Sequence, residues 1–405
     1  MNVKNNQLYF DGLSAEELIK KYKTPLYVYE AEVIRRQYNS LAKNISYPHT
    51  KIHYAAKANA NPAILKIIRQ LGGNIEAVSK GKILSAFKAG FKPGQIIYTC
   101  NGAEEEELRF VIDNDITANL DSLNQIETWG RLNPNSSISL RLNLDIGAGS
   151  HIYITTGGRR SKFGIHISKI KEAKKLAKKY GLRIVGLHQH IGSDVVDGKV
   201  FGKAMRTLLK IASQFPELEF VNFGGGFGIP YKPDQKPLDT KTLGDQITKI
   251  MNQFTKEYGK EINVIIEPGR YLVAQAGTLL TSVTDIKSNP SRTFVSTNTG
   301  FNHMIRSAMY FAYHNVTNAS RVEGKKKTVT VVGNICESAD IFAQDRVITN
   351  PKKGDILAIH DTGAYGYTMS SLYNARVKPA EVLIDNGKAK LIRERLNIEN
   401  ILDSI

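Results

Sequence analysis

Cysteine and tryptophan are scarce in this sequence of 405 residues, which contains two cysteines and one tryptophan. Neither Cys100 nor Cys336 stands at a metal-ligand spacing, so we expect no bound metal. Two distant cysteines form no disulfide framework, which is typical of a reducing compartment. The first residues lack the apolar stretch of a signal peptide, and no later run approaches the length of a membrane span. We therefore expect a soluble cytoplasmic protein with no membrane partner.

Acidic residues are fewer than basic ones, 38 against 55, which gives a formal net charge of +17. Such a charge invites a nucleic-acid-binding interpretation. The lysines, however, occur in short groups such as Lys174-Lys175 and Lys325 to Lys327, and none interleaves aromatic side chains with arginine as nucleic-acid modules do. We interpret the charge as a solvated basic face that steers small anions inward, and we expect no nucleic-acid partner.

The chain also lacks internal repeats, low-complexity segments and any linker rich in Pro, Gly or Ser. Between residues 51 and 267, apolar strand patterns alternate with helical patterns such as Gly81 to Ala89, Glu104 to Ile112 and Ile167 to Tyr180. The predicted strands are 51–56, 74–78, 95–99, 116–120, 137–143, 183–189, 218–223 and 263–267.

Eight strands, each but the last clearly followed by a helix, favour a closed parallel barrel over an open doubly wound sheet. No Gly-x-Gly-x-x-Gly turn follows the first strand, so the sequence does not argue for a dinucleotide-binding fold. We therefore predict the α/β class, with an eight-stranded (β/α)8 TIM-type barrel over residues 31–270.

Beyond residue 270 helical patterns nearly vanish, and strand–turn–strand patterns replace them. The predicted strands are 274–286, 293–296, 328–332, 355–359, 381–384 and 389–392, the last two joined through Asp385-Asn386-Gly387. Residues 1–30 add short strands and a helix that begins with the capping-box pattern Ser14-Ala-Glu-Glu17. We therefore predict a second, mostly antiparallel β domain formed by residues 1–30 together with 271–405.

Lys57 lies in the stretch Tyr54-Ala-Ala-Lys57-Ala-Asn-Ala-Asn61-Pro62, where a predicted strand ends and a helix begins at Pro62. In parallel α/β proteins the carboxyl ends of the strands face the ligand site, and an amine there can condense with a carbonyl cofactor. The alternative is a surface lysine that caps a strand.

Other polar residues follow the remaining strands and should share one rim with Lys57. They are Ser79, Asn101, Asp121, Arg141, His190, Gly224 to Gly226 and Glu267. An amine, an imidazole, a guanidinium, a carboxylate and a glycine run are the groups needed to hold pyridoxal phosphate. The glycines would approach the phosphate, Ser193 would reach it too, His190 would stack on the ring, and Glu267 would keep the ring nitrogen protonated. The alternatives are a tight glycine turn and a core histidine.

Several motifs resemble those of the alanine-racemase-fold decarboxylases that use pyridoxal phosphate. They are Tyr-Ala-x-Lys-Ala-Asn at 54–59, His-x-His-Ile-Gly-Ser at 188–193, Gly-Gly-Gly-Phe-Gly at 224–228 and Glu-Pro-Gly-Arg at 267–270. Further motifs resemble the diaminopimelate decarboxylases, namely Ser161 to Ile165, Ile305-Arg306, Tyr310, Tyr313-His314, Cys336 to Ser338, Gly363 to Tyr365 and Tyr373-Asn374. The resemblance runs from about Thr24 to Ile384.

This resemblance implies decarboxylation of meso-2,6-diaminopimelate to L-lysine and CO2, the last step of lysine biosynthesis. Lys57 would carry the cofactor as a Schiff base, His190 would cover the ring, and Glu267 would hold its nitrogen. Phosphate would bind to Ser193, Gly224, Gly225, Gly226 and Tyr365. The substrate would contact Arg270, Arg306, Tyr310, Glu337 and Tyr365. Cys336, the proton donor, would reach the site with Glu337 from the second subunit of a homodimer.

The sequence departs from the usual family pattern at three places: Lys82 replaces a glutamate, Ser307 replaces a proline, and the pair Asn334-Ile335 precedes Cys336 where a proline is commoner. The segment Gly147 to Gly164 resembles the family's closing loop. Two alternatives stay open. One is a decarboxylase of D-lysine, D-ornithine or a similar basic amino acid, which has less use for Arg306. The other is a non-catalytic regulatory relative, which could dispense with Lys57 and Cys336.

Overall fold

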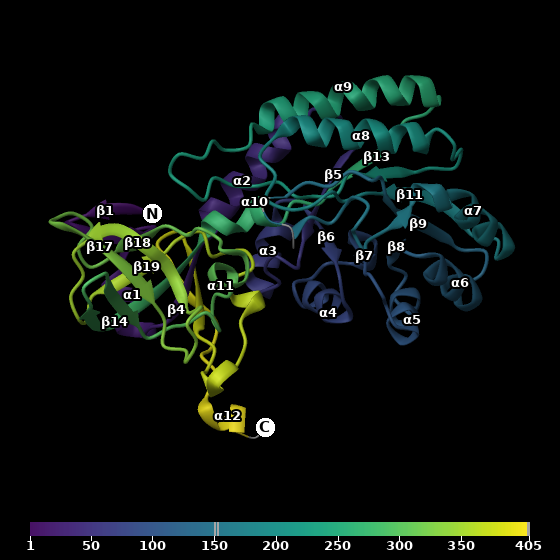
Figure 1. The fold of residues 1–405 in the computed structure, drawn as a ribbon. Coiled ribbons are helices and arrows are strands. Elements are labelled where there is room, and N and C mark those ends of the chain that lie inside the picture. The colour runs from purple at the N-terminus through teal and green to yellow at the C-terminus, as the bar shows by residue number, and fades with distance from the viewer. Residues whose placement is uncertain (150, 152–153, 403–405) are drawn as a thin grey trace. The chain divides into compact units, whose positions relative to one another are not determined.

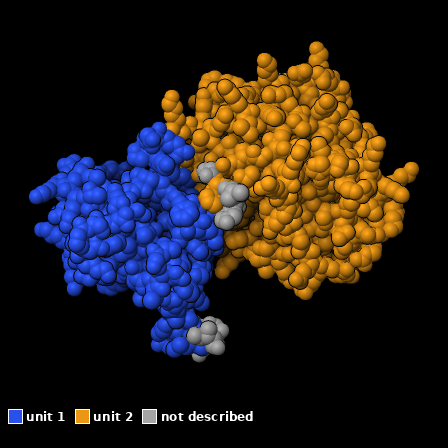
Figure 2. Space-filling view, in the orientation of Figure 1, with its two compact units in different colours: residues 1–35, 230–235, 273–405 blue, residues 36–229, 236–272 orange. Residues whose placement is uncertain are grey.

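The computed structural model describes residues 1–149, 151 and 154–402 (Figure 1). The chain divides into two compact units, coloured separately in Figure 2. One consists of residues 36–229 and 236–272, and the other of residues 1–35, 230–235 and 273–405. Each unit is described by itself below.

The first unit is a closed barrel of eight parallel strands, as predicted. Its strands are β5 (Thr50–Ala55), β6 (Asn74–Ala77), β7 (Ile96–Thr99), β8 (Thr117–Leu120), β9 (Ser137–Asn143), β11 (Arg183–His188), β12 (Phe220–Asn222) and β13 (Asn263–Ile266). The ring closes because β13 pairs with β5 and β8 pairs with β9. A short strand, β10 (Ile165–His166), also pairs with β9 and was not predicted.

Helices cover the barrel from outside, and all of them except α2, which precedes β5, come after barrel strands. They are α2 (Ala31–Asn44), α3 (Pro62–Gln70), α4 (Lys80–Lys88), α5 (Glu105–Asp113), α6 (Leu123–Leu132), α7 (Ile170–Lys179), α8 (Gly198–Ala212), α9 (Thr240–Tyr258) and α10 (Arg270–Val273). The helix predicted from Ile167 begins instead with a 3-10 turn, Ile167–Lys169. Among the residues described, no helix has the length and apolarity needed to cross a membrane.

Local sequence explains why α3 begins directly after the Lys57 stretch. Pro62 occupies the first helical turn, where its missing N–H costs nothing. The Asn61 side chain caps the helix by accepting a hydrogen bond from the Ala63 N–H at 3.0 Å. Ile64 and Ile68 lie on the buried face. Lys57 is thereby held between a barrel strand and a capped helix.

The barrel interior is apolar at mid-height. Ile97, Val185, Phe220 and Ile265 form one buried cluster contributed by four strands. Glycine is required opposite this cluster, since a Cβ on Gly186 would come within 2.2 Å of the Phe220 ring. The interior is therefore packed there, and the polar groups collect at the carboxyl ends of the strands.

The second unit contains a mostly antiparallel sheet, also as predicted. In spatial order its strands are β18 (Ile341–Thr349), β17 (Lys326–Val332), β15 (Thr293–Thr297), β14 (Gly277–Ser288), β4 (Leu26–Glu30), β20 (Ala380–Asp385) and β21 (Lys388–Arg393). β19 (Ile356–Ile359) pairs with β14 and with β16 (Val316–Asn318). Two pairs are parallel, β15 with β17 and β4 with β20.

The N-terminal segment packs onto this sheet. It contains β1 (Asn2–Lys4), β2 (Gln7–Phe10), β3 (Leu13–Ser14) and α1 (Ala15–Tyr22). The predicted capping box of α1 is present, with Ser14 and Glu17 bonded reciprocally. Phe10 and Leu18 join a buried cluster with Val28 and Leu280. The sequence did not predict β16, β18, α11 (Arg306–Tyr310) or α12 (Ile398–Leu402), and the predicted strand 274–286 begins only at Gly277.

Candidate active site

A cavity of about 330 Å³ lies at the carboxyl ends of the barrel strands. It is lined by Lys57, Glu76, Val78, Thr99, Cys100, Asn101, Arg141, Thr156, Lys162, Phe163, His188, His190 and Glu267. Five of the residues predicted to share one rim, Lys57, Asn101, Arg141, His190 and Glu267, are among them. Ser79 instead caps α4, and Asp121 accepts hydrogen bonds from Asn101 at 3.5 Å and from the Gly164 N–H at 3.3 Å.

Lys57 forms an ion pair inside this cavity that the sequence did not predict. Its ammonium donates to Glu76 Oε2 at 3.0 Å. The lysine side chain is 35% exposed, whereas that of Glu76 is 1% exposed. Burial raises the pKa of Glu76, and the charge of Lys57 opposes that rise. The lysine therefore keeps access to the cavity while a buried carboxylate fixes its position.

Glu267 lies at the end of β13 and accepts two hydrogen bonds. Asn222 Nδ2 donates to its Oε1 at 2.6 Å, and His188 Nε2 lies 3.1 Å from its Oε2. Burial alone would raise the pKa of Glu267. The attraction and hydrogen bond of His188, the charge of Lys57 and the bond from Asn222 together lower that pKa below its ordinary value. Glu267 is thus an ionised carboxylate held in a fixed orientation.

Strand register explains how these partners come together. His188 on β11 is level with Asn222 on β12 and with Arg141 on β9. A row across neighbouring parallel strands therefore carries an imidazole, an amide and a guanidinium. Arg141 is buried and stacks over the Phe163 ring at 4.6 Å. Its positive charge balances the carboxylates of Glu76 and Glu267, both of which attract it.

His190 is a neutral imidazole in this setting. Burial, with the positive charges of Lys57 and Arg141, holds its pKa well below the usual value. Its Nδ1 accepts a hydrogen bond from the Gly225 N–H at 3.2 Å, which leaves the proton on Nε2. A neutral ring of this kind can stack on a flat cationic ligand without repelling it.

The glycine run Gly224 to Gly226 passes very close to other backbone. A Cβ on Gly225 would lie 1.9 Å from the Glu267 carbonyl oxygen, and Gly226, at φ +97°, would meet that of Gly192 at 2.3 Å. The Gly224 N–H is bonded to Asn222 Oδ1 at 2.9 Å. Close backbone packing therefore explains why these positions require glycine. Two of the three amides, those of Gly224 and Gly225, already have hydrogen-bond partners within the protein.

Ser193 and Arg270 are brought into direct contact. Arg270 Nη2 donates to Ser193 Oγ at 3.0 Å, and Arg270 Nε lies 3.8 Å from Asp194 Oδ1. Residues 150, 152 and 153 of the segment Gly147 to Gly164 lie outside the described part of the chain. Its described residues bond to the same stretch, since the Ser193 N–H donates to the Ile154 carbonyl at 3.0 Å and Thr156 Oγ1 to that of His190 at 3.3 Å.

The second unit carries the remaining predicted site residues: Arg306, Tyr310, Cys336, Glu337 and Tyr365. Arg306 Nε donates to His314 Nε2 at 3.3 Å, and its guanidinium lies 4.9 Å from the centre of the Tyr231 ring. Burial raises the pKa of nearby Asp361 to about 7, against the opposing charge of Arg306. Cys336 and Glu337 are exposed in the loop between β17 and β18.

The positions that depart from the family pattern have ordinary local roles. The Lys82 N–H donates to Ser79 Oγ at 3.4 Å in the first turn of α4. Ser307 is buried, and its hydroxyl donates to the Phe342 carbonyl at 3.5 Å. The Asn334 N–H donates to the Thr299 carbonyl at 3.0 Å.

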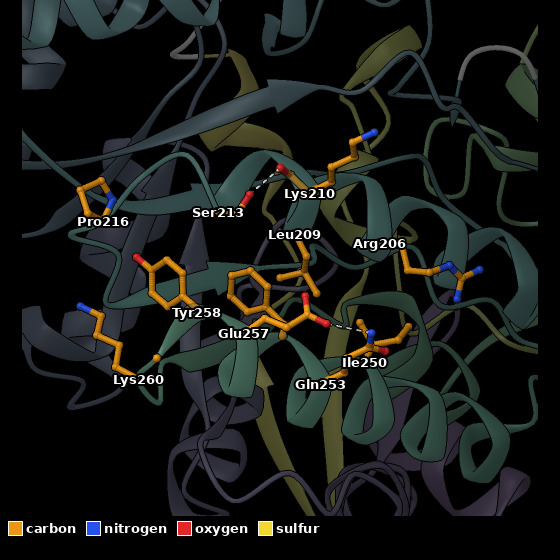
Figure 3. A pocket seen from close by; sticks show the side chains of 12 residues that line it. Arg206, Leu209, Lys210, Ser213, Pro216, Ile250, Gln253, Glu257, Tyr258 and Lys260 are labelled. Atoms are coloured by element: carbon orange, nitrogen blue, oxygen red, sulfur yellow. Dashed lines mark hydrogen bonds between the residues drawn. The ribbon is translucent and has the colours of Figure 1, made fainter.

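A larger cavity, about 650 Å³, lies on the barrel exterior between the ends of α8 and α9 (Figure 3). Its apolar floor includes Leu209 and Phe254, and exposed charged side chains such as Arg206 and Glu257 surround it. It contains none of the residues that follow the barrel strands, so size alone does not identify the site. Among the residues described, no group of three or more His, Cys, Asp or Glu could hold a metal ion.

Comparison with known proteins finds relatives over nearly the whole chain. Residues 31–274 match the family model described as the pyridoxal-binding domain of pyridoxal-dependent decarboxylases. The chain is 40% identical to the diaminopimelate decarboxylase of Methanothermobacter thermautotrophicus, over 98% of this chain and 94% of that one. It is 35% identical to the enzyme of Escherichia coli K12, over 96% of each chain.

A solved structure of the Methanocaldococcus jannaschii diaminopimelate decarboxylase with L-lysine is also similar, at a TM-score of 0.93 and 34% identity. The match covers 100% of this chain and 96% of that one. The Helicobacter pylori enzyme, also solved with L-lysine, gives a TM-score of 0.90 at 31% identity, over 96% and 98% of the two chains.

Proposed function

The chain belongs to the diaminopimelate decarboxylase family of pyridoxal-dependent decarboxylases, and we propose that it converts meso-2,6-diaminopimelate to L-lysine and CO2, the last step of lysine biosynthesis. One observation about the cavity supports this assignment. A lysine amine and a buried, ionised carboxylate line the same cavity at the carboxyl ends of the barrel strands. An amine and an anion are the two anchors that an aldehyde on a cationic ring requires.

The residues of the cavity fit pyridoxal phosphate. The cavity volume suits a small ring, Lys57 is accessible, His190 is neutral, and Glu267 is ionised. When bound, this cofactor supplies an aldehyde for linkage to an amine and an electron sink for the bond that breaks. Lys57 would provide the amine, His190 would cover one ring face, and Glu267 would accept a hydrogen bond from the ring nitrogen and keep it protonated.

The phosphate group would be held by Ser193, Gly224, Gly225 and Gly226, with Tyr365. Ser193 offers a hydroxyl whose orientation is set by Arg270. The amides of Gly224 and Gly225 already bond to Asn222 and His190. Phosphate binding at those amides would therefore replace two internal hydrogen bonds with stronger, charge-assisted ones.

Substrate recognition needs groups of both charges, because diaminopimelate carries a second amino-acid centre beyond the reacting carbon. We assign Arg270, Arg306 and Tyr310, with Tyr365, to its carboxylates and Glu337 to its distal ammonium. Arg306 is well suited, since its hydrogen bond to His314 and its position over Tyr231 fix the guanidinium plane. A substrate that lacks the distal carboxylate would make no charge-assisted contact with this guanidinium.

Cys336 would return a proton to the carbon from which CO2 departs, and it would act in the site of a second subunit. Its exposure in a single chain is consistent with a contact that forms only in a homodimer. The active sites would then be shared across the interface.

The proposed function is tested by product identification. The purified chain with pyridoxal phosphate and meso-diaminopimelate should release L-lysine and CO2 in equal amounts, as detected by chromatography and mass spectrometry. D-lysine and D-ornithine should give less than about 1% of that kcat/KM, because neither has a distal carboxylate to bind Arg306. Absence of lysine from cofactor-loaded protein would refute the assignment.

Replacing Glu267 by glutamine should weaken cofactor binding and catalysis. The amide cannot accept at both positions, so its NH2 would face either Asn222 or His188, and the ring nitrogen would lose its anion. A charge-assisted hydrogen bond is worth about 1.5–3 kcal/mol, so we expect kcat/KM to fall roughly 10- to 100-fold. Steady-state kinetics and cofactor titration measure both effects.

Glu219→Gln is the matched control for this change. Glu219 is exposed immediately before β12, at the opposite end of the strands, and pairs with Arg183 at 3.5 Å. Its loss should leave both parameters within twofold. If Glu267→Gln and Glu219→Gln showed the same kcat/KM and the same cofactor affinity, the role assigned to Glu267 would be wrong.

A further inference from the structure

Two loops of the second unit begin at the carboxyl ends of two neighbouring strands of its sheet. Residues 298–305 follow β15, and residues 333–340 follow β17. β15 and β17 are parallel, with Ser296 level with Val332, so both chains emerge side by side. The first loop leads into α11, which carries Arg306, and the second carries Cys336 and Glu337.

Asp340 joins these two loops through its side chain. Its Oδ1 accepts a hydrogen bond from the Phe301 N–H at 2.7 Å, and its Oδ2 accepts one from the Ile335 N–H at 2.8 Å. Phe301 belongs to the first loop, and Ile335 immediately precedes Cys336. The side chain therefore spans the gap between the segments that carry the proposed substrate-binding arginine and the proposed proton donor.

The surroundings of Asp340 leave it little freedom. The residue is 3% exposed. A Cβ on Gly333 would lie 2.2 Å from its Oδ2, and one on Gly300 would lie 2.9 Å from the same atom. One glycine from each loop thus makes room for the carboxylate. Its own backbone closes the second loop, because the Gly333 N–H donates to the Asp340 carbonyl at 3.0 Å.

The charge state of Asp340 suits this bridging role. Burial raises its pKa to about 6, while the bonds from Ile335 and Phe301 and the charge of Arg376 oppose that rise. The side chain is therefore ionised at neutral pH and acts as an acceptor at both oxygens. Asparagine has nearly the same shape but offers one acceptor and one donor, so it can satisfy only one of the two amides.

We propose that Asp340 is a positioning residue, whose carboxylate holds the Cys336–Glu337 loop in register with the segment that leads to Arg306. This inference rests on the proposed function for its effect on catalysis, although the bridge between the loops can be measured without it. Asp340 would act through other residues and would contact no substrate. Catalysis is sensitive to such placement, since a shift of about 1 Å can cost on the order of 100-fold in rate.

Asp340→Asn should separate activity from stability. We expect kcat/KM for diaminopimelate to fall about 10- to 100-fold, with changes in both kcat and KM because Cys336 and Glu337 share the loop. The melting temperature should change little, because the substitution removes one hydrogen bond and also the cost of a buried charge. Hydrogen exchange of the cofactor-loaded protein should show the Ile335 or Phe301 amide exchanging on the order of tenfold faster.

Two further variants give the inference a control and an independent check. Asp355 is a buried carboxylate of the same unit whose partners are Asn318, Arg321 and Lys352, so Asp355→Asn should lower the melting temperature without changing kcat/KM more than twofold. Gly333→Ala retains Asp340 but displaces its carboxylate, and it should reproduce the kinetic loss of Asp340→Asn.

Different results would contradict the positioning role of Asp340 and the proposed function of the chain. Asp340→Asn with wild-type kinetics, or with a kinetic loss but unchanged exchange at both amides, would overturn the positioning role. A fall in kcat/KM equal to that of Asp355→Asn would mean that Asp340 is merely structural, and it would also overturn the positioning role. If the wild-type chain forms no lysine, the proposed function fails, and the exchange measurement alone decides whether Asp340 ties the two loops.

Discussion

Lys57→Ala should lower kcat by on the order of 10⁴-fold or more, because it removes the amine that we propose links covalently to the cofactor aldehyde. The ammonium of Lys57 is held by Glu76 within the cavity, and alanine removes the reacting group without adding bulk. The long-wavelength absorbance of the bound cofactor should disappear in the variant. Borohydride reduction of the wild-type protein should place the cofactor on the peptide that contains Lys57.

Lys51→Ala is the matched control for this substitution. Lys51 lies on the same strand, β5, but it is exposed near the amino end. Its removal should leave kcat and the cofactor spectrum unchanged. Covalent labelling at a lysine other than Lys57, or turnover by Lys57→Ala above about 1% of wild type, would contradict the role assigned to this residue.

Cys336→Ala should lower kcat by roughly 100-fold or more, as expected when a general acid is removed. Cys336 is exposed in a single chain, and we have placed it in the site of a second subunit. Mixing the inactive Lys57→Ala and Cys336→Ala chains should therefore restore activity. If subunits reassort freely, we expect about one quarter of the wild-type activity, since half the dimers would be hybrids with one intact site each.

A Cys336 that serves its own chain predicts the opposite result for the mixture. Both sites of every hybrid would then lack one essential group, and no activity would return. Differently tagged chains, purified through both tags, show that hybrids have formed before activity is measured. The same purification from two Lys57→Ala chains should remain inactive and provides the background.

The barrel could be predicted from sequence because its signal is periodic. Each strand is a short apolar run followed by an amphipathic helix, and the predicted strand at 137–143 matches β9 at both ends. The second unit was harder to predict. β18 has exposed residues at Gln344, Asp345 and Val347, the first two adjacent, so it shows no clean alternation. The helix α11 is only five residues long, too short to show a helical period.

The candidate site was predicted mainly where residues follow strands, and of the polar residues within strands only Arg141 was singled out. Lys57, His190 and Glu267 come after apolar runs and are visible as polar interruptions. Glu76 and His188 lie inside β6 and β11, where a single polar residue among apolar neighbours is easily taken for a strand-face residue. Glu76 did carry a signal, because a charged residue is almost never fully buried without a partner.

The proposed site residues of the second unit do not follow a regular series of strands. Arg306, Cys336 and Glu337 were singled out only through family resemblance, since nothing in their spacing indicates a common role. Asp340 was not singled out at all. Its importance depends on strand direction, because only the parallel pairing of β15 and β17 brings Phe301 and Ile335 within reach of one carboxylate.

The antiparallel pairing of β17 with β18 has an evolutionary and engineering consequence. The loop 333–340 is a hairpin connection whose two ends are fixed by the pairing of Val332 with Ile341. It is therefore a short segment that could be exchanged between relatives together with the neighbouring residues Thr299 to Phe301, which it contacts, while the barrel and its cofactor anchors stay unaltered. Substrate preference could then be altered by exchanging this hairpin tip, provided that the exchanged segment keeps Cys336 as the proton donor.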